Sequence, residues 1–287
     1  MDLLVEAAVR VNRRLRRPPL ARRASDDAYS EWEYESGRAL FLEYFDPGSL
    51  ANRRVLDAAC GLGGKTVWYA EAGAAVVFGV DLELANLRQT RAWAARRAAG
   101  TRVSCLAGDV LRLPLRDACV DVVTANDAME HFAEPEAALA ELSRVVRPGG
   151  RLFITFPPYG SAHGAHLYDY IGLPWCQLLL PRRALYATLE RSIRETEHQL
   201  GHDDDARVQR IKREQIEFFE HALNRITVGR FVRMVRAEPR VQIRRLRCVP
   251  PKLKWLEPLA SLPGLREVLA GLVVAELERI EPAARAA

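Results

Sequence analysis

Three carboxylates stand in the first half of the chain at intervals that suit the binding of a nucleoside. Asp57 lies in the run 55–64 (VLDAACGLGG), where an apolar stretch passes into a glycine-rich turn. Asp81 follows 24 residues later at the end of a second apolar run, and Asp109 follows Asp81 by 28 residues. A carboxylate at the end of a strand can accept hydrogen bonds from a ribose diol, and glycines let backbone approach a ligand closely. The glycine-rich turn followed by Asp81 at the end of the next apolar run is therefore typical of a nucleoside site.

A second group of residues suits proton transfer. Three of the six histidines, His131, His163 and His166, fall in loops expected to follow strands. Imidazole titrates near neutral pH and can take a proton from a hydroxyl group. With Glu130 and Tyr159 they form the candidate catalytic set, in which His131 ranks first. The three histidines could alternatively hold a metal, because H-x-x-H can supply two imidazoles. No carboxylate stands clearly in register with them, so we expect no metal.

The elements that must position these residues follow an alternating pattern. From residue 53 to about 156, apolar runs alternate with helical patterns, which is typical of a parallel βαβ sheet covered on both faces. The expected strands are 54–58, 75–80, 103–107, 120–125, 151–156, 241–249 and one near 272–277. The expected helices are 2–17, 26–45, 65–72, 84–99, 134–146 and 226–237, with a turn at 147–150.

The predicted fold class is α/β, a Rossmann-like, doubly wound and mostly parallel seven-stranded sheet. N-terminal helices precede the sheet, and a helical lid is inserted after the fifth strand. We expect four segments: N-terminal helices (1–50), a core that binds the cofactor (51–156), a helical acceptor-binding insertion (157–225) and a C-terminal completion of the sheet (226–287).

Charge and composition limit the function. The net charge is +5, and residues 1–24 hold seven arginines against two acidic residues, which leaves the remaining chain balanced. That basic leader could contact nucleic acid, bind a membrane surface or direct transport into an organelle. The five cysteines are scattered without metal spacing, which argues against a disulfide framework or a zinc site. Because the sequence has no transmembrane run and no secretory signal, we expect a cytoplasmic protein.

The glycine-rich turn fits one of three known templates. A dinucleotide-binding G-x-G-x-x-G would need glycine where Thr66 stands. A phosphate-binding P-loop is nearly met by Gly64, Lys65 and Thr66, but its first glycine would fall at Ala59. The segment resembles motif I of the class I S-adenosylmethionine (SAM) dependent methyltransferases, of the type 11 kind that acts on small molecules. Asp81, the Asp109 region and residues 121–131 resemble the later motifs of that family.

The resemblance implies SAM as cofactor and S-adenosylhomocysteine (SAH) as product. It assigns the methionine part of SAM to the turn after the first strand, the ribose to the end of the second, the adenine to the end of the third and the amino acid end to the backbone after the fourth. The implied cofactor-binding residues, in that order, are Asp57, Ala59, Gly61, Gly63, Asp81, Leu82, Asp109, Val110 and Asn126. A helix holding Trp32, Tyr34 and Arg38 is expected to close over the cofactor, with Arg38 as a candidate partner of the methionine carboxylate.

We expect methyl transfer to a small, partly apolar metabolite in bacterial specialised metabolism, by a monomer or homodimer. Oxygen is favoured as the methylated atom, followed by carbon or nitrogen, and Glu130 is a candidate base if the acceptor is an alkene. No membrane span and no nucleic acid partner are expected. One alternative is a tRNA or rRNA methyltransferase with residues 1–24 as a basic arm, and another is a P-loop nucleotide-binding module.

Overall fold

The computed structural model describes residues 2–15, 25–97, 99–251, 255 and 257–281. The chain divides into two compact units. The sheet unit comprises 21–156, 229–247 and 273–287, and the helical unit comprises 1–20, 157–228 and 248–272. None of the helices within the described ranges is long and apolar enough to cross a membrane.

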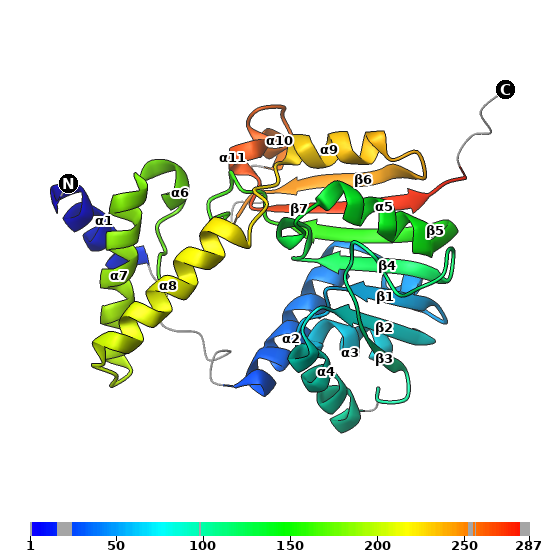
Figure 1. Cartoon of the computed structure of the whole chain (residues 1–287). Helices are drawn as coiled ribbons and strands as arrows, with labels where there is room; N and C mark the ends of the chain where they lie inside the picture. The colour runs from blue at the N-terminus through cyan, green and yellow to red at the C-terminus, as the bar shows by residue number, and fades with distance from the viewer. Residues whose placement is uncertain (1, 16–24, 98, 252–254, 256, 282–287) are drawn as a thin grey trace. The chain divides into compact units, whose positions relative to one another are not determined.

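The sheet unit is built on seven strands in the order β3-β2-β1-β4-β5-β7-β6 (Figure 1). The strands are β1 (Arg54–Ala58), β2 (Val76–Asp81), β3 (Val103–Ala107), β4 (Val120–Asn126), β5 (Val146–Phe156), β6 (Val241–Val249) and β7 (Leu272–Arg279). The first five run parallel, and β7 pairs antiparallel with β5. The predicted seven-stranded, mostly parallel fold is confirmed.

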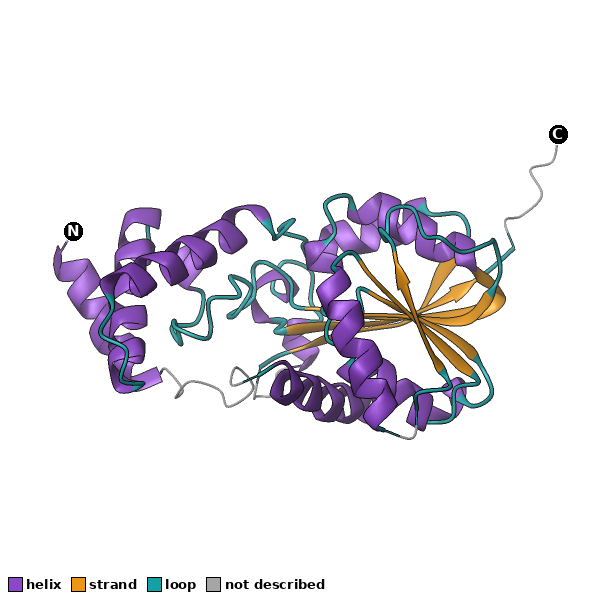
Figure 2. Cartoon of the chain, turned by 60° about the horizontal axis from the view of Figure 1, so that its bottom comes forward, coloured by secondary structure: helices purple, strands orange, loops and turns teal. Residues whose placement is uncertain are grey.

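Helices cover both faces of this sheet (Figure 2). They are α2 (Asp26–Tyr44), α3 (Gly64–Glu71), α4 (Leu84–Arg96), α5 (Pro135–Val145) and α9 (Val228–Ala237), with short 3₁₀ turns η2 (Pro47–Leu50) and η3 (Met129–His131). The central strands β1 and β4 are buried on both faces, as their continuous apolar sequence predicts. Aromatic rings join α2, α3 and β5, where Phe41 packs against Trp68, Tyr69 and Phe153 with ring centroids 5.1–5.8 Å apart.

Residues 147–150, which the sequence predicts to form a turn before the fifth strand, lie within β5 instead. The ladder pairs Val146 with Val120 and next pairs Arg151 with Val122, so the intervening residues loop out of register. Gly149 adopts a positive φ of 74°, which L side chains rarely take. The turn chemistry is therefore present, but it forms an irregularity inside a strand.

The helical unit contains α1 (Asp2–Leu15), α6 (Cys176–Leu179), α7 (Arg182–Gln199), α8 (Asp205–His221), α10 (Glu257–Ala260) and α11 (Arg266–Leu269). Its core joins α1 to segments far away in the sequence. Val5 and Val9 of α1 are buried with Leu189 and Ile193 of α7. Asn12 is also buried, and its side chain hydrogen-bonds the hydroxyl of Ser192 at 2.8 Å, the carbonyl of residue 170 and the N–H of residue 172.

This packing changes the meaning of the basic leader. In its described part the leader is a core helix, and its outward face forms ion pairs within the same unit, such as Arg13 with Glu195 and Glu6 with Arg191. Four leader arginines, at 16, 17, 22 and 23, lie outside the described residues. Deleting residues 1–24 would remove buried side chains of the helical unit. Such a deletion therefore cannot separate an RNA arm from a structural helix.

Candidate cofactor site

The predicted site residues meet at one edge of the sheet. Strands β3, β2, β1 and β4 are neighbours in that order, and all four run parallel, so their carboxyl ends share an edge. Asp109, Asp81, the glycine-rich turn and Asn126 follow these ends in the same order. Three inter-strand spacings make this row about 14 Å long, which suits an adenosine joined to an amino acid chain.

The turn from β1 into α3 takes backbone conformations that favour glycine. Ala59, Gly61 and Gly63 all have positive φ, with 83° at Gly63. A Cβ on Gly63 would lie 2.5 Å from the side chain of Thr90, so glycine is required there by both backbone and space. Asp81 fixes the turn from the next strand, because its Oδ2 accepts a hydrogen bond from the N–H of Gly61 at 2.9 Å.

Asp81 retains capacity for a ligand. Its Oδ1 accepts from the N–H of Glu83 at 2.9 Å and from Nδ2 of Asn86 at 3.1 Å. A carboxylate can accept about four hydrogen bonds, and Asp81 makes three with the protein. One acceptor position thus remains for a ribose hydroxyl. Leu82, the next residue, is 68% exposed and so presents an apolar surface beside it.

Asp57 is enclosed by hydroxyl groups. Its Oδ2 accepts from Oγ1 of Thr66 at 2.6 Å, and its Oδ1 accepts from Oγ1 of Thr124 at 3.2 Å. Burial raises the pKa of Asp57 to about 6, against the opposing effect of the two hydroxyls and of Lys65. In this structure Asp57 therefore joins β1, α3 and β4. Its expected contact with the methionine part of SAM stays a prediction.

Helix α2 packs directly on the glycine-rich turn. The hydroxyl of Ser30 donates to the carbonyl of Leu62 at 2.9 Å, and Oε2 of Glu33 accepts from the N–H of Gly64 at 3.3 Å. A Cβ on Gly64 would lie only 2.1 Å from the carbonyl oxygen of Ser30. The expectation that a helix around Trp32 covers this part of the site agrees with these contacts.

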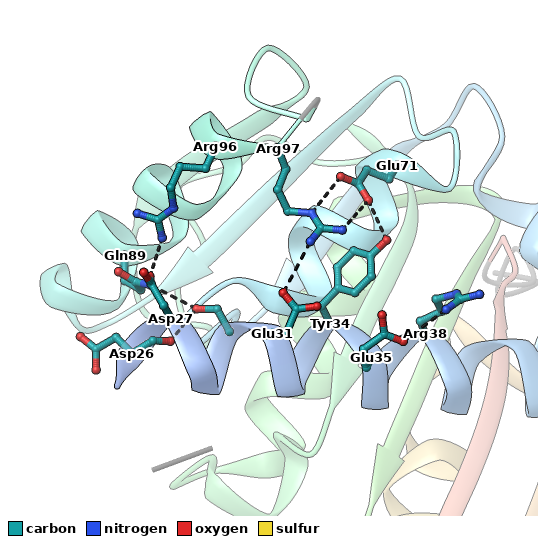
Figure 3. Close-up of polar contacts among 11 residues, drawn as sticks. Asp26, Asp27, Glu31, Tyr34, Glu35, Arg38, Glu71, Gln89, Arg96 and Arg97 are labelled. Carbon is teal, nitrogen blue, oxygen red and sulfur yellow. Dashed lines mark hydrogen bonds and ion pairs between the residues drawn. The ribbon is translucent and has the colours of Figure 1, made fainter. Parts of the chain in front are cut away.

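Polar contacts also fasten α2 to α3 and α4 (Figure 3). Arg97 pairs with Glu71 at 3.1 Å and with Glu31 at 3.6 Å, and the hydroxyl of Tyr34 donates to Glu71 at 2.6 Å. Near the start of α2, Asp27 accepts from Gln89 at 2.7 Å. The helix is thus anchored on both sides of the turn that it covers.

Lys65 is the cation that this arrangement largely buries, with 13% of its side chain exposed. Its Nζ donates to the carbonyl oxygen of Asn126 at 3.0 Å and lies 3.2 Å from Oδ2 of Asp127. Burial disfavours the charged amine, but Asp127 and Glu33 outweigh that effect and raise the pKa of Lys65, which keeps it protonated. The methylene chain of Lys65 passes under Gly37, where a Cβ would lie 2.7 Å from Cγ.

Glu33 is the matching buried carboxyl. Burial raises its pKa to about 7, and Lys65 and the Gly64 N–H partly offset that rise. Asp57 and Asp127 raise it further. Glu33 therefore exists in both protonation states near neutral pH.

Asn126 is held from three sides. Its side-chain Nδ2 donates to the hydroxyl of Tyr69, and its Oδ1 accepts from Oγ1 of Thr155 at 3.2 Å. Its carbonyl oxygen accepts from Lys65. These bonds fix the backbone that the resemblance places near the amino acid end of SAM.

The adenine end of the row is more open. Asp109 is exposed, and its Oδ1 accepts from the N–H of Leu111 at 2.9 Å. Val110 beside it is buried. The adenine contacts expected of Asp109 and Val110 stay a prediction.

The candidate catalytic residues fall in both units. Glu130 and His131 lie together on η3 of the sheet unit, with 3.8 Å between Oε1 and Nε2. Burial and the nearby Asp127 raise the pKa of Glu130 well above its ordinary value. Tyr159, His163 and His166 belong to the helical unit. There the ring centroid of His166 lies 6.0 Å from that of Tyr168 and 6.1 Å from that of Phe218. Catalytic roles for these five residues stay predictions.

Sequence reasoning missed Lys65 and Glu33 and proposed Arg38 as the cation instead. Arg38 is half exposed and pairs with Glu35 at 3.2 Å on the surface of α2. The Gly-Lys-Thr run was the available signal, but it matched a P-loop only in part. In the structure the Thr66 hydroxyl donates to Asp57, and Lys65 donates to the carbonyl of Asn126 at the end of β4.

A separate cavity of about 530 Å³ lies at the opposite, amino end of the strands. Four arginines line it, but four carboxylates line it as well, so it carries no excess charge. Its charged residues are Glu43, Asp46, Arg53, Asp121, Arg147, Arg151, Arg245 and Glu276. The cavity is thus distinct from the row of predicted cofactor residues.

The polar groups at the carboxyl edge of the sheet fit SAM. The ligand offers a ribose diol, an adenine amine and a zwitterionic amino acid. The row offers one acceptor position on Asp81, an exposed carboxylate at Asp109 and a buried cation and carboxyl at Lys65 and Glu33. Each polar group of the ligand has a partner of complementary charge or hydrogen-bonding type.

Comparisons with known proteins support this assignment. Residues 56–154 match the family described as "Methyltransferase domain". The chain is 35% identical over 126 residues to a demethylmenaquinone methyltransferase of Renibacterium salmoninarum, covering 42% of this chain and 50% of the relative. It is 32% identical over 159 residues to the ubiquinone/menaquinone biosynthesis C-methyltransferase UbiE of Acidiphilium cryptum, covering 54% of this chain and 63% of the relative. The chain thus spans between half and two thirds of these relatives.

The fold has close parallels among solved structures. A geranyl diphosphate methyltransferase in complex with SAM superimposes with a TM-score of 0.55 at 17% identity, covering 96% of this chain and 95% of that chain. Together with the match over residues 56–154, this likeness confirms the resemblance seen in the sequence. Residues 56–154 match a methyltransferase domain, and the chain has the fold of the class I SAM-dependent methyltransferases.

Proposed function

We propose that the chain transfers a methyl group from SAM to a small, partly apolar acceptor that loses a proton during the reaction. The observation that carries the proposal is the row of complementary groups from Asp109 through Asp81 to Lys65 at one edge of the sheet. The relatives point to the acceptor class, because their names refer to demethylmenaquinone and to ubiquinone or menaquinone biosynthesis. We infer a hydroxylated aromatic or enol-like acceptor with an apolar substituent.

The methyl donor supplies an activated methyl group, and the protein supplies position and proton transfer. In-line displacement at a methyl carbon depends mainly on the alignment of the two reactants. The tight hydrogen bonding around Asn126 and Asp57 gives the sheet edge the rigidity that such alignment needs.

His131 is the proposed acceptor of the proton. Its side chain is about one third exposed, so an acceptor molecule can reach it, and it stands 3.8 Å from Glu130. Burial and the nearby Asp127 raise the pKa of Glu130, so its carboxyl ionises less readily than an exposed glutamate. A phenol needs a base whether oxygen or ring carbon is methylated. Oxygen methylation, favoured by the sequence, and carbon methylation, named for the second relative, are both compatible with this role.

The helical unit is proposed to contribute to acceptor binding through His163, His166 and Tyr159. The apolar stretch 170–180 also lies in this unit, but Tyr170, Ile171, Cys176 and Leu180 pack into the core of the unit. We therefore assign acceptor specificity to the loop that carries Tyr159, His163 and His166, and not to the stretch 170–180.

The RNA alternative has less support, because the described part of the basic leader is a core helix. A direct test incubates the protein with methyl-labelled SAM and either total RNA or a panel of prenylated quinols and phenols. Incorporation into the small molecules and not into RNA supports the proposal, and the reverse contradicts it. Mass spectrometry of the product then identifies the methylated atom.

Calorimetry separates the proposal from a nucleotide-binding module. We expect SAH to bind and ATP with magnesium not to bind.

His131→Ala should lower turnover by about tenfold or more, whereas His198→Ala, at an exposed histidine of α7, should not. Dialysis against a chelator should leave turnover unchanged, which tests the expectation that no metal takes part.

A further inference from the structure

The buried charges at the glycine-rich turn suggest how the amino acid end of the cofactor is recognised. We propose that Lys65 and Glu33 bind the carboxylate and the ammonium of the methionine moiety, respectively, as a matched pair. The inference rests on the proposed use of SAM. It concerns two residues that the sequence comparison with the family does not assign.

Lys65 has a free donor position at the required place. A protonated amine has three N–H donors, and the described contacts use two of them, to Asn126 and Asp127. The carbonyl of Asn126 belongs to the backbone expected near the amino acid end of SAM. Asp127 is 45% exposed, so water screens its attraction to Lys65. A ligand carboxylate at the third donor would receive a stronger, less hydrated ion pair.

Glu33 has a free acceptor on the opposite side. Its Oε2 accepts from the N–H of Gly64, whereas its Oε1 has no hydrogen-bond partner among the described residues. Oε1 lies 3.1 Å from the position that a Cβ on Gly61 would occupy, so it stands directly beside the glycine-rich turn. An ammonium group placed beside Oε1 would donate a charge-assisted hydrogen bond to it.

Lys65 and Glu33 together complement a zwitterionic ligand better than a ligand with a single charge. The carboxylates that face Lys65 come from three elements: Glu33 from α2, Asp57 from β1 and Asp127 after β4. The cation comes from α3. A ligand with one charge alone would pair with only one of the two groups.

The pKa of Glu33 also predicts how many protons are released when SAH binds. Its pKa of about 7 means that about half of the unliganded molecules carry a proton on Glu33 at pH 7. An adjacent ammonium favours the ionised carboxylate. Binding of SAH at pH 7 should therefore release about half a proton into solution.

Calorimetry with three probes tests the pair without depending on turnover. The probes are SAH, its analogue without the amine (S-adenosylthiobutyrate) and its analogue without the carboxylate (S-adenosylthiopropylamine). Wild type should prefer SAH to either analogue by about tenfold or more. Lys65→Met should lose the preference over the carboxylate-free analogue and bind that analogue as wild type does. Glu33→Gln should lose the preference over the amine-free analogue.

Buffers with different ionisation enthalpies report the released proton. Wild type should release about half a proton at pH 7, and Glu33→Gln should release none. The control variant is Glu35→Gln, which changes an exposed charge on the same helix and should match wild type.

The outcomes distinguish the proposal from its premise. If wild type binds none of the probes, the assignment of SAM as cofactor is wrong. If SAH binds but each variant weakens all three probes alike, the residues only support the fold and the pairing is wrong. Because the truncated analogues serve as internal folding controls, a variant that binds its own analogue normally is folded.

Discussion

Replacing Glu33 by glutamine removes a buried charge while keeping the acceptor for the Gly64 N–H, so its effect on stability should depend on pH. The carboxyl has an ordinary pKa of 4.5, and burial raises it to about 7 in the folded protein. A group that binds its proton more tightly when folded stabilises the fold at low pH. That contribution is complete below pH 4.5 and is lost as the pH rises towards and through 7.

The magnitude follows from the two pKa values. Between pH 5 and pH 8, wild type should lose about 2.5 kcal/mol of unfolding free energy through Glu33 alone. Glutamine has no such dependence. The difference between Glu33→Gln and wild type should therefore move by about 2.5 kcal/mol in favour of the variant over that range. Asp57 also has a raised pKa, but it is present in both proteins and its contribution cancels.

The assay is denaturant unfolding of both proteins without ligand at pH 5, 6, 7 and 8. Glu35→Gln is the matched control, since Glu35 is more than half exposed and should give a flat difference. A Glu33→Gln difference that stays constant within about 0.5 kcal/mol over this range would refute the argument, because it would mean that Glu33 titrates normally in the folded protein.

Three further substitutions test other parts of the structure. Thr66→Val removes the shorter hydrogen bond to the buried Asp57 and should cost about 1.5–3 kcal/mol at pH 7, measured by the same unfolding assay, and less at pH 5, where more Asp57 is protonated. Gly63→Ala places a Cβ at positive φ and 2.5 Å from Thr90, so the midpoint temperature of thermal unfolding should fall by several degrees and SAH affinity by about tenfold or more. An unchanged affinity would show that the turn does not form the site. Asn12→Ala leaves buried backbone groups without their partners and should cost about 1–3 kcal/mol, seen as faster hydrogen exchange in α1, which a peripheral leader would not show.

The sheet and the row of carboxylates could be predicted because their signals are local. A continuous apolar run such as 120–125 identifies a strand buried on both faces, and a carboxylate that ends the run must then lie at the edge where parallel strands finish. The order of the strands places Asp81 and Asp109 next to the glycine-rich turn. These features need no knowledge of how the helices pack.

The buried pair could not be predicted because its signal depends on tertiary packing. Glu33 meets Gly64 across 31 residues and becomes buried only when α2 packs on the turn. In the sequence it is one of several acidic residues on a polar helix, and its burial is not visible there. The same holds for α1, whose amphipathic pattern predicts a buried face but does not say that α7 covers it.

The placement of α1 has a consequence for synthesis on the ribosome. Asn12 hydrogen-bonds Ser192, which is added to the growing chain 180 residues later. At about 5–20 residues per second, α1 waits roughly 10 to 35 seconds for its partner helix. Throughout that interval Val5 and Val9 have no native partner to cover them. The nascent chain therefore offers an apolar stripe to chaperones during that interval, and slowing translation should lengthen it.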